Sequence, residues 1–383
     1  MNKHMPYDLP QMQSLPLEAK EIMSLQRTEQ WFIHWDGNVY VSFSGGKDST
    51  VVAHLCARFC KQYGYTLYLM FANTGLEYPE IQRFVKEYAE YLRQTFGIEV
   101  VLDIVRPEMR FDEVIKKYGY PVIGKQQANV IRLARQNIKQ GKYTLRLRSL
   151  GILPDEAKEM GLELPSNEML ERYESTAKGS MYNIPNYRYL LNAPFKISEQ
   201  CCDVMKKAPA KRYGKETGRK PILGILAHES MIRKAAWLKT GCNAFNAKSP
   251  SSTPIAFWTE QDVLHYIKKH DVPYCSVYGD IVVKPSDPEV PDNQMDIADY
   301  LGEYTEADQL MTTGCDRTGC IFCMFGSQCQ KGENRHQRDK KTHPRQHKYF
   351  AYGGEYGEDG MWQPSKEGLG CGKVLDYIGV KYE

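Results

Sequence analysis

A glycine-containing stretch, Ser44-Gly45-Gly46-Lys47-Asp48-Ser49, has the residue types of an anion-binding loop. Strand-like residues 39–43 precede it, and an apolar pattern at helical spacing follows it. The two glycines let the backbone approach a ligand closely, and the start of a helix offers free N–H groups and a positive dipole end. Lys47 adds a cation and the serines add hydroxyl donors. The stretch is too short for the Walker pattern, but it predicts a phosphate or sulfate site between a strand and a helix.

Eleven cysteines form the second set of residues that could carry chemistry. An odd number in a chain without a secretion signal argues against a disulfide framework and favours metal ligands or reactive thiols. Cys320 and Cys323 form a CxxC pair that can hold one metal centre, and the tandem pair Cys201-Cys202 can complete four sulfur ligands. Adjacent cysteines chelate a single ion poorly, which makes zinc less natural than an iron–sulfur cluster. Unliganded thiols are the third alternative.

Alternating strand and helix patterns surround the glycine loop. Strands are expected at 39–43, 66–72, 99–105 and 221–226, and helices at 16–31, 49–63, 79–96, 195–207 and 258–270. This alternation predicts an α/β fold with a doubly wound, mostly parallel sheet. Ligands of such sheets bind beyond the carboxyl ends of the strands, which is where the glycine loop is expected.

Composition divides the chain into three expected parts. They are an N-terminal helical extension (1–35), an α/β domain that contains the glycine loop (36–285) and a cysteine-rich C-terminal segment with a basic tail (286–383). A helical basic insertion is expected within the second part, at about residues 125–190, and a proline-containing linker at 284–296. Cys56 and Cys60, four residues apart on an apolar helix, are expected in the core.

The bulk composition is that of an ordinary soluble globule, with 42% apolar and 25% charged residues. Because apolar runs stay short of about 18 residues, no membrane partner is expected, and a cytoplasmic location follows from the absence of a signal pattern. The net charge of +3 is mild, but residues 125–148 and 331–348 each carry seven Lys or Arg. These stretches can meet nucleic-acid phosphates or form a solvated surface.

Several stretches together resemble one family. SGGKDS resembles the PP-loop, the pyrophosphate-binding loop of the ATP pyrophosphatase and adenylylsulfate reductase superfamily, which has the adenine nucleotide alpha hydrolase-like fold. FANTGLEYPEI (71–81) and FWTEQDVLHYIKKHDVPYCSVYG (257–279) resemble segments of the phosphoadenylylsulfate (PAPS) reductase family. The resemblance implies an adenine nucleotide, either ATP or PAPS/APS, with its phosphate or sulfate on Ser44, Gly45, Gly46, Lys47, Asp48 and Ser49. It also implies that Asp48 helps to hold Mg²⁺, and that Thr74, Gly75 and Glu77 border the sugar or base.

The stretch GILAHES (224–230) resembles the GxRxxES-type motif of the same family. Leu226 stands where the motif has arginine, and Arg233 is a candidate to supply that charge. His228 and Glu229 are candidate acid–base groups, with a structural hydrogen bond as the alternative. The predicted catalytic residues are Lys47, Asp48 and Glu229.

The cysteine pattern resembles that of cluster-bearing adenylylsulfate reductases, in which a tandem pair and a later CxxC hold a 4Fe–4S cluster. The resemblance implies Cys201, Cys202, Cys320 and Cys323 as ligands. Cys315 and Cys329 are candidates to replace one of them. Arg317 is a candidate to stabilise the charge of the cluster, with a solvated loop charge as the alternative.

Three functions remain open at this point. The first is a PAPS reductase-type enzyme of sulfur metabolism, although Cys371-Gly372 is only a faint match to the C-terminal Cys-Gly nucleophile of such reductases. The second is an ATP-dependent sulfurtransferase that modifies nucleic acid and resembles enzymes of DNA phosphorothioation and tRNA thiolation. Either enzyme implies a sulfur or electron donor protein as partner. The third is a non-catalytic regulator that binds nucleotide and DNA and contains a metal centre.

Overall fold

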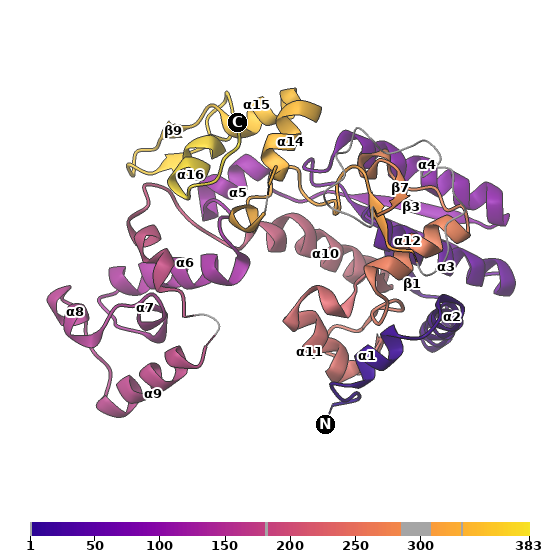
Figure 1. Ribbon diagram of the computed structural model, residues 1–383, viewed down its shortest axis with the longest axis horizontal. Helices are drawn as coiled ribbons and strands as arrows, with labels where there is room; N and C mark the ends of the chain where they lie inside the picture. Colours follow the sequence, from indigo (N-terminus) through magenta and orange to yellow (C-terminus); the bar gives the residue numbers. More distant parts are fainter. Residues whose placement is uncertain (1, 181–182, 285–307, 331) are drawn as a thin grey trace. The chain divides into compact units, whose positions relative to one another are not determined.

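The computed structural model describes residues 2–180, 183–284, 308–330 and 332–383 (Figure 1). The chain forms two compact units, each made of two separate segments. The first unit comprises Met1–Pro107 and Ala208–Cys320, and the second comprises Glu108–Lys207 and Ile321–Glu383. The expected extension 1–35 lies in the first unit and the expected insertion at 125–190 lies in the second. The domain boundaries expected from the sequence stay a prediction.

A six-stranded sheet forms the centre of the first unit, in the order β3-β2-β1-β4-β6-β5. Its strands are β1 (Val39–Ser42), β2 (Leu67–Ala72), β3 (Val100–Val105), β4 (Lys220–Leu223), β5 (Asn243–Ala244) and β6 (Ser251–Ser252). All neighbours pair in parallel except β5 and β6, and Val41 lies opposite Leu69 on one side and Ile222 on the other. The mostly parallel sheet confirms the predicted α/β class.

Helices cover both faces of this sheet because alternate residues of a strand point to opposite sides. Tyr40 of β1 points to one face, where it packs with Met70 and with Tyr213 of α10 (Ala208–Thr217). The buried Val39 and Val41 therefore point to the other face, where α3 (Lys47–Tyr63) packs against β1, β2 and β4. The sheet is thus covered on both sides, as a doubly wound fold requires.

The first unit contains further helices and strands besides the sheet, α3 and α10. They are α1 (Asp8–Gln13), α2 (Leu17–His34), α4 (Pro79–Phe96), η3 (Ala227–Glu229), α11 (Met231–Thr240), α12 (Glu260–Lys269), η4 (Ser276–Tyr278), β7 (Ile281–Val283) and β8 (Leu310–Thr312). The N-terminal segment is integral to the unit: Trp31 is buried, Lys20 forms an ion pair of 2.7 Å with Asp262, and Ser24 accepts a hydrogen bond from the Trp258 indole.

The second unit is mainly helical. Its elements are α5 (Phe111–Tyr118), α6 (Lys125–Lys139), α7 (Leu145–Ser149), α8 (Pro154–Glu159), α9 (Asn167–Lys178), η1 (Pro185–Asn192), η2 (Asp203–Lys207), η6 (Ser327–Cys329), α14 (Arg335–Thr342), α15 (Pro344–Ala351), β9 (Glu355–Tyr356), β10 (Trp362–Gln363) and α16 (Cys371–Tyr377). Its two chain segments are joined in the interior, where the buried Tyr120 hydroxyl donates to the Leu369 carbonyl at 2.8 Å.

Most expected elements are confirmed to within a few residues. The strands expected at 39–43, 66–72, 99–105 and 221–226 correspond to β1 to β4, and Cys56 and Cys60 are fully buried. The prediction of a helix over 195–207 was wrong for the first half of this range. Phe195 and Ile197 form bridges to Trp362 and Tyr120, so this stretch is extended and the helical backbone begins only at Cys201. The linker expected at 284–296 lies, beyond its first residue, outside the described residues.

Within the described part of the chain, none of the helices combines the length and apolar character that crossing a bilayer requires.

One histidine of α3 is buried in the first unit. His54 of α3 is 5% exposed, and its Nδ1 lies 2.8 Å from the Tyr266 hydroxyl. Burial, together with the nearby His270 and Arg58, lowers the pKa of His54 from 6.5 to about 3. The folded chain therefore keeps this imidazole neutral under conditions in which the unfolded chain would protonate it.

We expect the free energy of unfolding of the first unit to fall as the pH is lowered from 6.5 towards 3, because the unfolded state then binds a proton that the folded state excludes. One such histidine contributes a slope of about 1.4 kcal/mol per pH unit. The His54→Gln variant should have a correspondingly shallower slope, whereas His34→Gln, at an exposed position, should not. Urea unfolding followed by tryptophan fluorescence measures this, and equal slopes in both variants would contradict it.

Candidate functional site

The order of the strands places a crevice at the carboxyl ends of the strands. The chain runs from β1 to β2 and β3 on one side and returns to β4 and β6 on the other. Ligands of open α/β sheets bind outside the carboxyl ends of the strands at the point where the strand order reverses in this way. The residues that follow β1 and β4 are therefore the first candidates for a site, and they include the glycine loop and the stretch 224–230.

The glycine loop, residues 44–49, joins β1 directly to α3. Gly45 has a φ of +73°, and a Cβ there would lie 2.9 Å from the Ile81 side chain, so the turn requires glycine. The Ser44 and Ser49 hydroxyls lie 3.0 Å apart, and Ser49 also donates to the Gly46 carbonyl at 2.9 Å. These bonds hold the loop against the first turn of the helix, where unpaired N–H groups favour an anion.

Gly224, directly after β4, approaches the glycine loop most closely. A Cβ on Gly224 would lie 2.7 Å from the Ser49 backbone nitrogen and 2.8 Å from the Asp48 carbonyl carbon. The end of β4 thus packs on the backbone of the first turn of α3, which is possible only without a side chain. The contact brings residues 226–229 beside Lys47 and Asp48.

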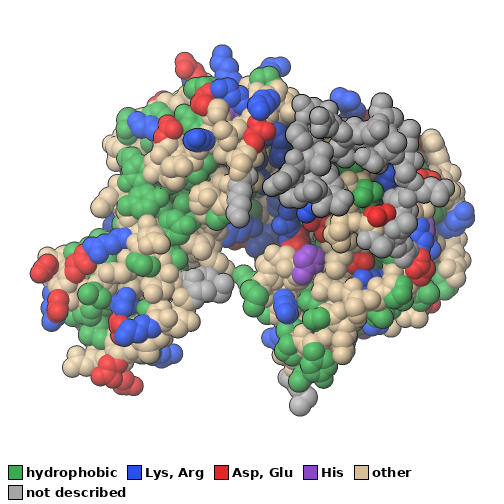
Figure 2. Space-filling model, viewed as in Figure 1, with side chains coloured by type: hydrophobic (Ala, Val, Ile, Leu, Met, Phe, Trp, Pro, Cys, Tyr) green, Lys and Arg blue, Asp and Glu red, His purple; other side chains and the backbone are tan. Residues whose placement is uncertain are grey.

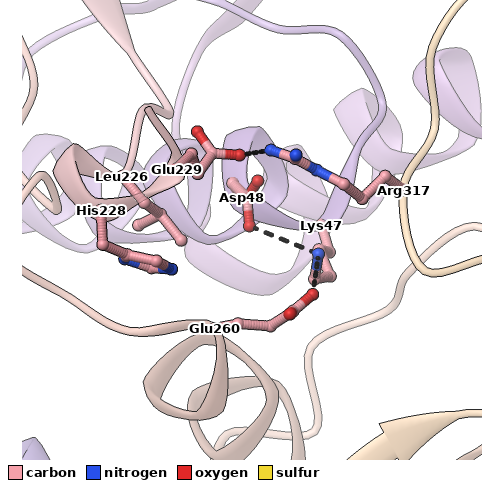
Figure 3. A pocket seen from close by; sticks show the side chains of 7 residues that line it. All are labelled: Lys47, Asp48, Leu226, His228, Glu229, Glu260 and Arg317. Atoms are coloured by element: carbon pink, nitrogen blue, oxygen red, sulfur yellow. Dashed lines mark ion pairs between the residues drawn. The ribbon is translucent and has the colours of Figure 1, made fainter. Parts of the chain in front are cut away.

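Two overlapping pockets, each with a volume of about 180 Å³, open at this crevice. Figure 3 shows one of them, with side chains from α3, from the segment after β4, from α12 and from the 316–318 loop pointing into it. The residues that line one or both pockets are Ser44, Gly46, Lys47, Asp48, Ser49, Gly224, Leu226, His228, Glu229, Arg233, Glu260, Tyr278, Arg317 and Thr318.

Lys47 lies at the floor of the pocket and is 5% exposed. Its ammonium group forms an ion pair of 2.8 Å with Glu260, lies 3.8 Å from Asp48 and donates to the Asp316 carbonyl at 3.2 Å. Glu260 is 48% exposed and can turn towards solvent. A phosphate or sulfate could therefore replace this carboxylate as the partner of Lys47.

Asp48 is the carboxylate nearest to Lys47 in sequence, and it is partly buried. Burial raises its pKa, while the nearby Lys47 and Arg317 act in the opposite direction. Its Oδ1 atom is shielded from solvent and has no hydrogen-bond partner within the described chain. A carboxylate oxygen in this state is suited to bind a cation.

Glu229 lies between two arginines in the same pocket. Its two carboxylate oxygens form ion pairs, one with Arg233 and the other with Arg317. The pair with Arg317 is drawn in Figure 3. Arg317 was expected beside a cysteine-bound cluster, and the structure brings its side chain to this pocket. Leu226 lines the pocket with an apolar side chain, so at least two guanidinium groups supply charge where the family motif has arginine. The acid–base role of Glu229 stays a prediction.

The 316–318 loop is fastened to the glycine loop on either side of Arg317. Asp316 accepts the hydrogen bond from Lys47, and the Thr318 hydroxyl lies 3.0 Å from the Tyr278 hydroxyl. Tyr278 in turn accepts the hydrogen bond of the Lys47 backbone N–H at 3.1 Å. One donor of the helix start is thus occupied by a neutral hydroxyl, which an anion of the right shape can replace.

The loop after β2 is folded back on itself. Thr74 donates its hydroxyl to Glu77 at 2.7 Å and its backbone N–H to the same carboxylate at 3.0 Å. Thr74 and Glu77 are each 8% exposed, and neither they nor Gly75 lines the two pockets. Because β2 lies parallel to its neighbour β1, this loop follows the carboxyl end of its strand, as the glycine loop does. Its contact with a nucleotide stays a prediction.

The predicted metal ligands fall in both units. Cys201 and Cys202 have sulfur atoms 3.9 Å apart at the start of a helix in the second unit, while the boundary between the units falls directly after Cys320. The hydrogen bond from Cys201 lowers the pKa of Cys202 to about 5, and Lys125 acts in the same direction. Among residues 2–180, 183–284, 308–330 and 332–383, no three His, Cys, Asp or Glu side chains are grouped as a metal site. The four-sulfur site stays a prediction.

The first basic stretch, 125–148, uses three of its arginines inside the second unit. Arg132 forms an ion pair of 2.7 Å with Glu199, and Arg148 forms one of 2.5 Å with Glu174. Arg135 donates to four backbone carbonyls, among them that of Phe195 at 2.6 Å. Over α7, α8 and α9, Figure 2 shows basic and acidic side chains intermingled. These contacts account for part of the positive charge without a nucleic-acid partner.

The second basic stretch, 331–348, is likewise anchored to its neighbours where it is described. Lys341 forms an ion pair of 2.6 Å with Glu333, and Lys340 pairs with Glu383. Phe350, an aromatic residue just after this stretch, is buried and stacks on Phe322. Contact of either stretch with nucleic acid stays a prediction.

Sequence reasoning missed Glu260, Tyr278 and Thr318 as residues of the pocket. Glu260 lies in the stretch 257–279, which resembles the family, but its contact with Lys47 depends on how α12 packs. Tyr278 lies in a segment that was linked to the family, so that resemblance was the one available signal. Nothing in the local sequence around Thr318 indicates that it meets Gly46.

Comparison with known protein families gives a match over most of the chain. The model of the family described as "Phosphoadenosine phosphosulfate reductase domain" matches residues 38–135 and 123–324, which together span about three-quarters of the 383 residues. Among curated proteins, no match to the chain was found.

We expect the Lys47→Ala variant to bind ATP or PAPS about 10- to 100-fold more weakly, because a charge-assisted contact to the phosphate is lost. Isothermal titration of the wild type and the variant measures this. Lys86→Ala, at an exposed position of α4, is the matched control and should bind as the wild type does. An unchanged affinity in Lys47→Ala would remove the glycine loop from the site.

Proposed function

Because the chain belongs to the phosphoadenosine phosphosulfate reductase domain family, we propose that it is an enzyme of sulfur metabolism or sulfur transfer that binds an adenine nucleotide in this crevice. The observation that carries the proposal is the convergence of Lys47, the start of α3 and two arginines on one pocket at the strand reversal. Cations and backbone N–H groups that point into one cavity are suited to a polyanion.

A magnesium ion fits this pocket through Asp48. Its shielded carboxylate oxygen has no hydrogen-bond partner among the described residues, and Mg²⁺ is commonly held by one or two carboxylates together with substrate phosphates and water. When bound, the ion would neutralise phosphate charge. The residues of the chain would then orient the nucleotide, with Lys47 and the loop N–H groups on the anion and Leu226 excluding water beside it.

Two reactions of the family differ in what they require from the chain. A PAPS reductase needs a thiolate that attacks the sulfate sulfur and releases adenosine 3′,5′-bisphosphate, after which a reductant releases sulfite. The C-terminal candidate for this thiolate, Cys371, is fully buried in the second unit, and burial raises its pKa. A buried neutral thiol is a poor nucleophile.

This observation favours the second candidate function, ATP-dependent sulfur transfer. An acceptor oxygen would attack the α-phosphorus of ATP and release pyrophosphate, and a sulfur nucleophile from a donor protein would then displace AMP. Nucleic acid is the acceptor proposed for this reaction, and the two basic stretches are the proposed contacts.

An iron–sulfur cluster is proposed for the predicted cysteine set. The donor set fits, because Cys201 and Cys202 present two sulfur atoms together and Cys320 and Cys323 have CxxC spacing. When bound, a 4Fe–4S cluster would supply electron transfer or sulfur delivery. Zinc would need the same four thiolates and remains the alternative.

Anaerobic incubation of the full chain with Mg²⁺ and either ATP or PAPS, with sulfide as the sulfur source, tests the reaction. We expect pyrophosphate and AMP from ATP, in amounts that rise when the acceptor is added. Asp48→Asn should reduce this release at least about tenfold if the carboxylate binds the ion. Sulfite from PAPS would instead identify a reductase, and release of neither product would favour the non-catalytic regulator.

We expect anaerobically purified protein to be brown and to contain about four iron atoms per chain. Cys202→Ser should lose most of this iron because it removes one of the paired sulfur ligands. Cys329→Ser, at an exposed cysteine outside the predicted set, should retain it. Colourless protein with stoichiometric zinc would contradict the cluster, and iron loss in Cys329→Ser would revise the ligand set.

A further inference from the structure

The pocket is electrically balanced without a ligand. Its lining includes three cations, Lys47, Arg233 and Arg317, and three carboxylates, Asp48, Glu229 and Glu260. Lys47 pairs with both Asp48 and Glu260, whereas Arg233 and Arg317 both pair with Glu229. A nucleotide with several negative charges can enter only if carboxylates give up their partners or if a metal ion enters with it.

The guanidinium groups are the cations best placed to change partners. The side chains of Arg233 and Arg317 are 41% and 56% exposed, whereas that of Lys47 is 6% exposed. Arginine carries five donors in a planar fork that matches the oxygens of phosphate or sulfate, so it can bind an anion in the place of a carboxylate.

Arg317 is also held in position before any ligand binds. Its two sequence neighbours are both bonded. Asp316 accepts a hydrogen bond from the Lys47 ammonium group, and Thr318 bonds to Tyr278, which in turn accepts from the Lys47 backbone N–H. The backbone at Arg317 therefore needs little further ordering, which lowers the entropic cost of using its side chain for binding.

We propose that Arg317 recognises the anionic group of the nucleotide beyond the α-phosphate, and that Glu229 is the internal counter-ion that this group displaces. The proposal rests on the proposed function, since it assumes a nucleotide in this pocket. It assigns to Arg317, from a segment far along the chain, the charge that the family motif has at Leu226. The group recognised is a terminal phosphate or a sulfate, two anions of similar shape.

Titration of the full chain with ATP, PAPS, AMP and adenosine 3′,5′-bisphosphate in Mg²⁺ buffer tests the proposal. The Arg317→Gln variant should lose about 10- to 100-fold in affinity for ATP or for PAPS. It should lose less than about threefold for AMP, which lacks the distal phosphates of ATP, and for adenosine 3′,5′-bisphosphate, which keeps the 3′-phosphate of PAPS but lacks its sulfate. The ligand with the larger loss identifies the anion as phosphate or sulfate. Arg317→Lys should recover part of the loss, because it keeps the charge without the fork.

The counter-ion is tested by Glu229→Gln. This variant should bind ATP or PAPS more tightly than the wild type, by about 3- to 30-fold, since the competing carboxylate is gone while both arginines remain. A residue with only a structural role would weaken binding when replaced. Arg83→Gln, at an exposed position of α4, is the matched control and should leave all four affinities unchanged. Circular dichroism and thermal melting check that the variants are folded.

The outcomes separate this inference from the proposed function. If the wild type binds ATP or PAPS and Arg317→Gln loses affinity equally for the nucleotide that lacks the distal group, or loses none, Arg317 does not recognise the distal anion and the inference is wrong while the proposed function stands. If the folded wild type binds none of the four nucleotides, the proposed function is wrong and the inference falls with it.

Discussion

The site depends on the close approach of Gly224 to the first turn of α3. Because a Cβ on Gly224 would lie 2.7 Å from the Ser49 nitrogen, the end of β4 can reach the backbone of the glycine loop only as glycine. That contact closes the crevice between the two halves of the sheet and sets residues 226–229 beside Lys47. The start of α3, Lys47 and the two arginines can then contact one anion, although they belong to segments far apart in the sequence.

The resulting pocket contains equal numbers of positive and negative side chains, and this balance of charge determines how an anion could bind. Lys47 is held by Glu260 and Asp48, and Arg317 by Glu229, so an anion exchanges with carboxylates instead of entering a strongly positive field. Such an arrangement keeps buried cations paired when the ligand is absent, which avoids the cost of an uncompensated charge. It also makes the binding of a polyanion dependent on Mg²⁺ or on movement of glutamates.

The glycine loop and the central sheet could be predicted from the sequence because their signals are local. SGGKDS identifies a turn between strand and helix, and alternating patterns identify β1 to β4. Residues 224–230 and Arg233 could be expected at the site only through the family resemblance. The remaining pocket residues depend on tertiary packing, as the contact between Lys47 and Asp316, 269 residues apart, illustrates. The expected helix over 195–207 failed for a related reason, since Phe195 and Ile197 form bridges to distant residues that override their local pattern. The cysteine ligands and the nucleic-acid contacts stay predictions from the sequence.

A crystal structure of the full chain with Mg²⁺ and a non-hydrolysable ATP analogue tests the central claim most directly. The account predicts phosphate oxygens about 3 Å from the Lys47 ammonium and from the N–H groups of residues 46–49, with Glu260 turned away from Lys47. Density for the phosphates outside the crevice, with the ion pair between Lys47 and Glu260 intact, would contradict it.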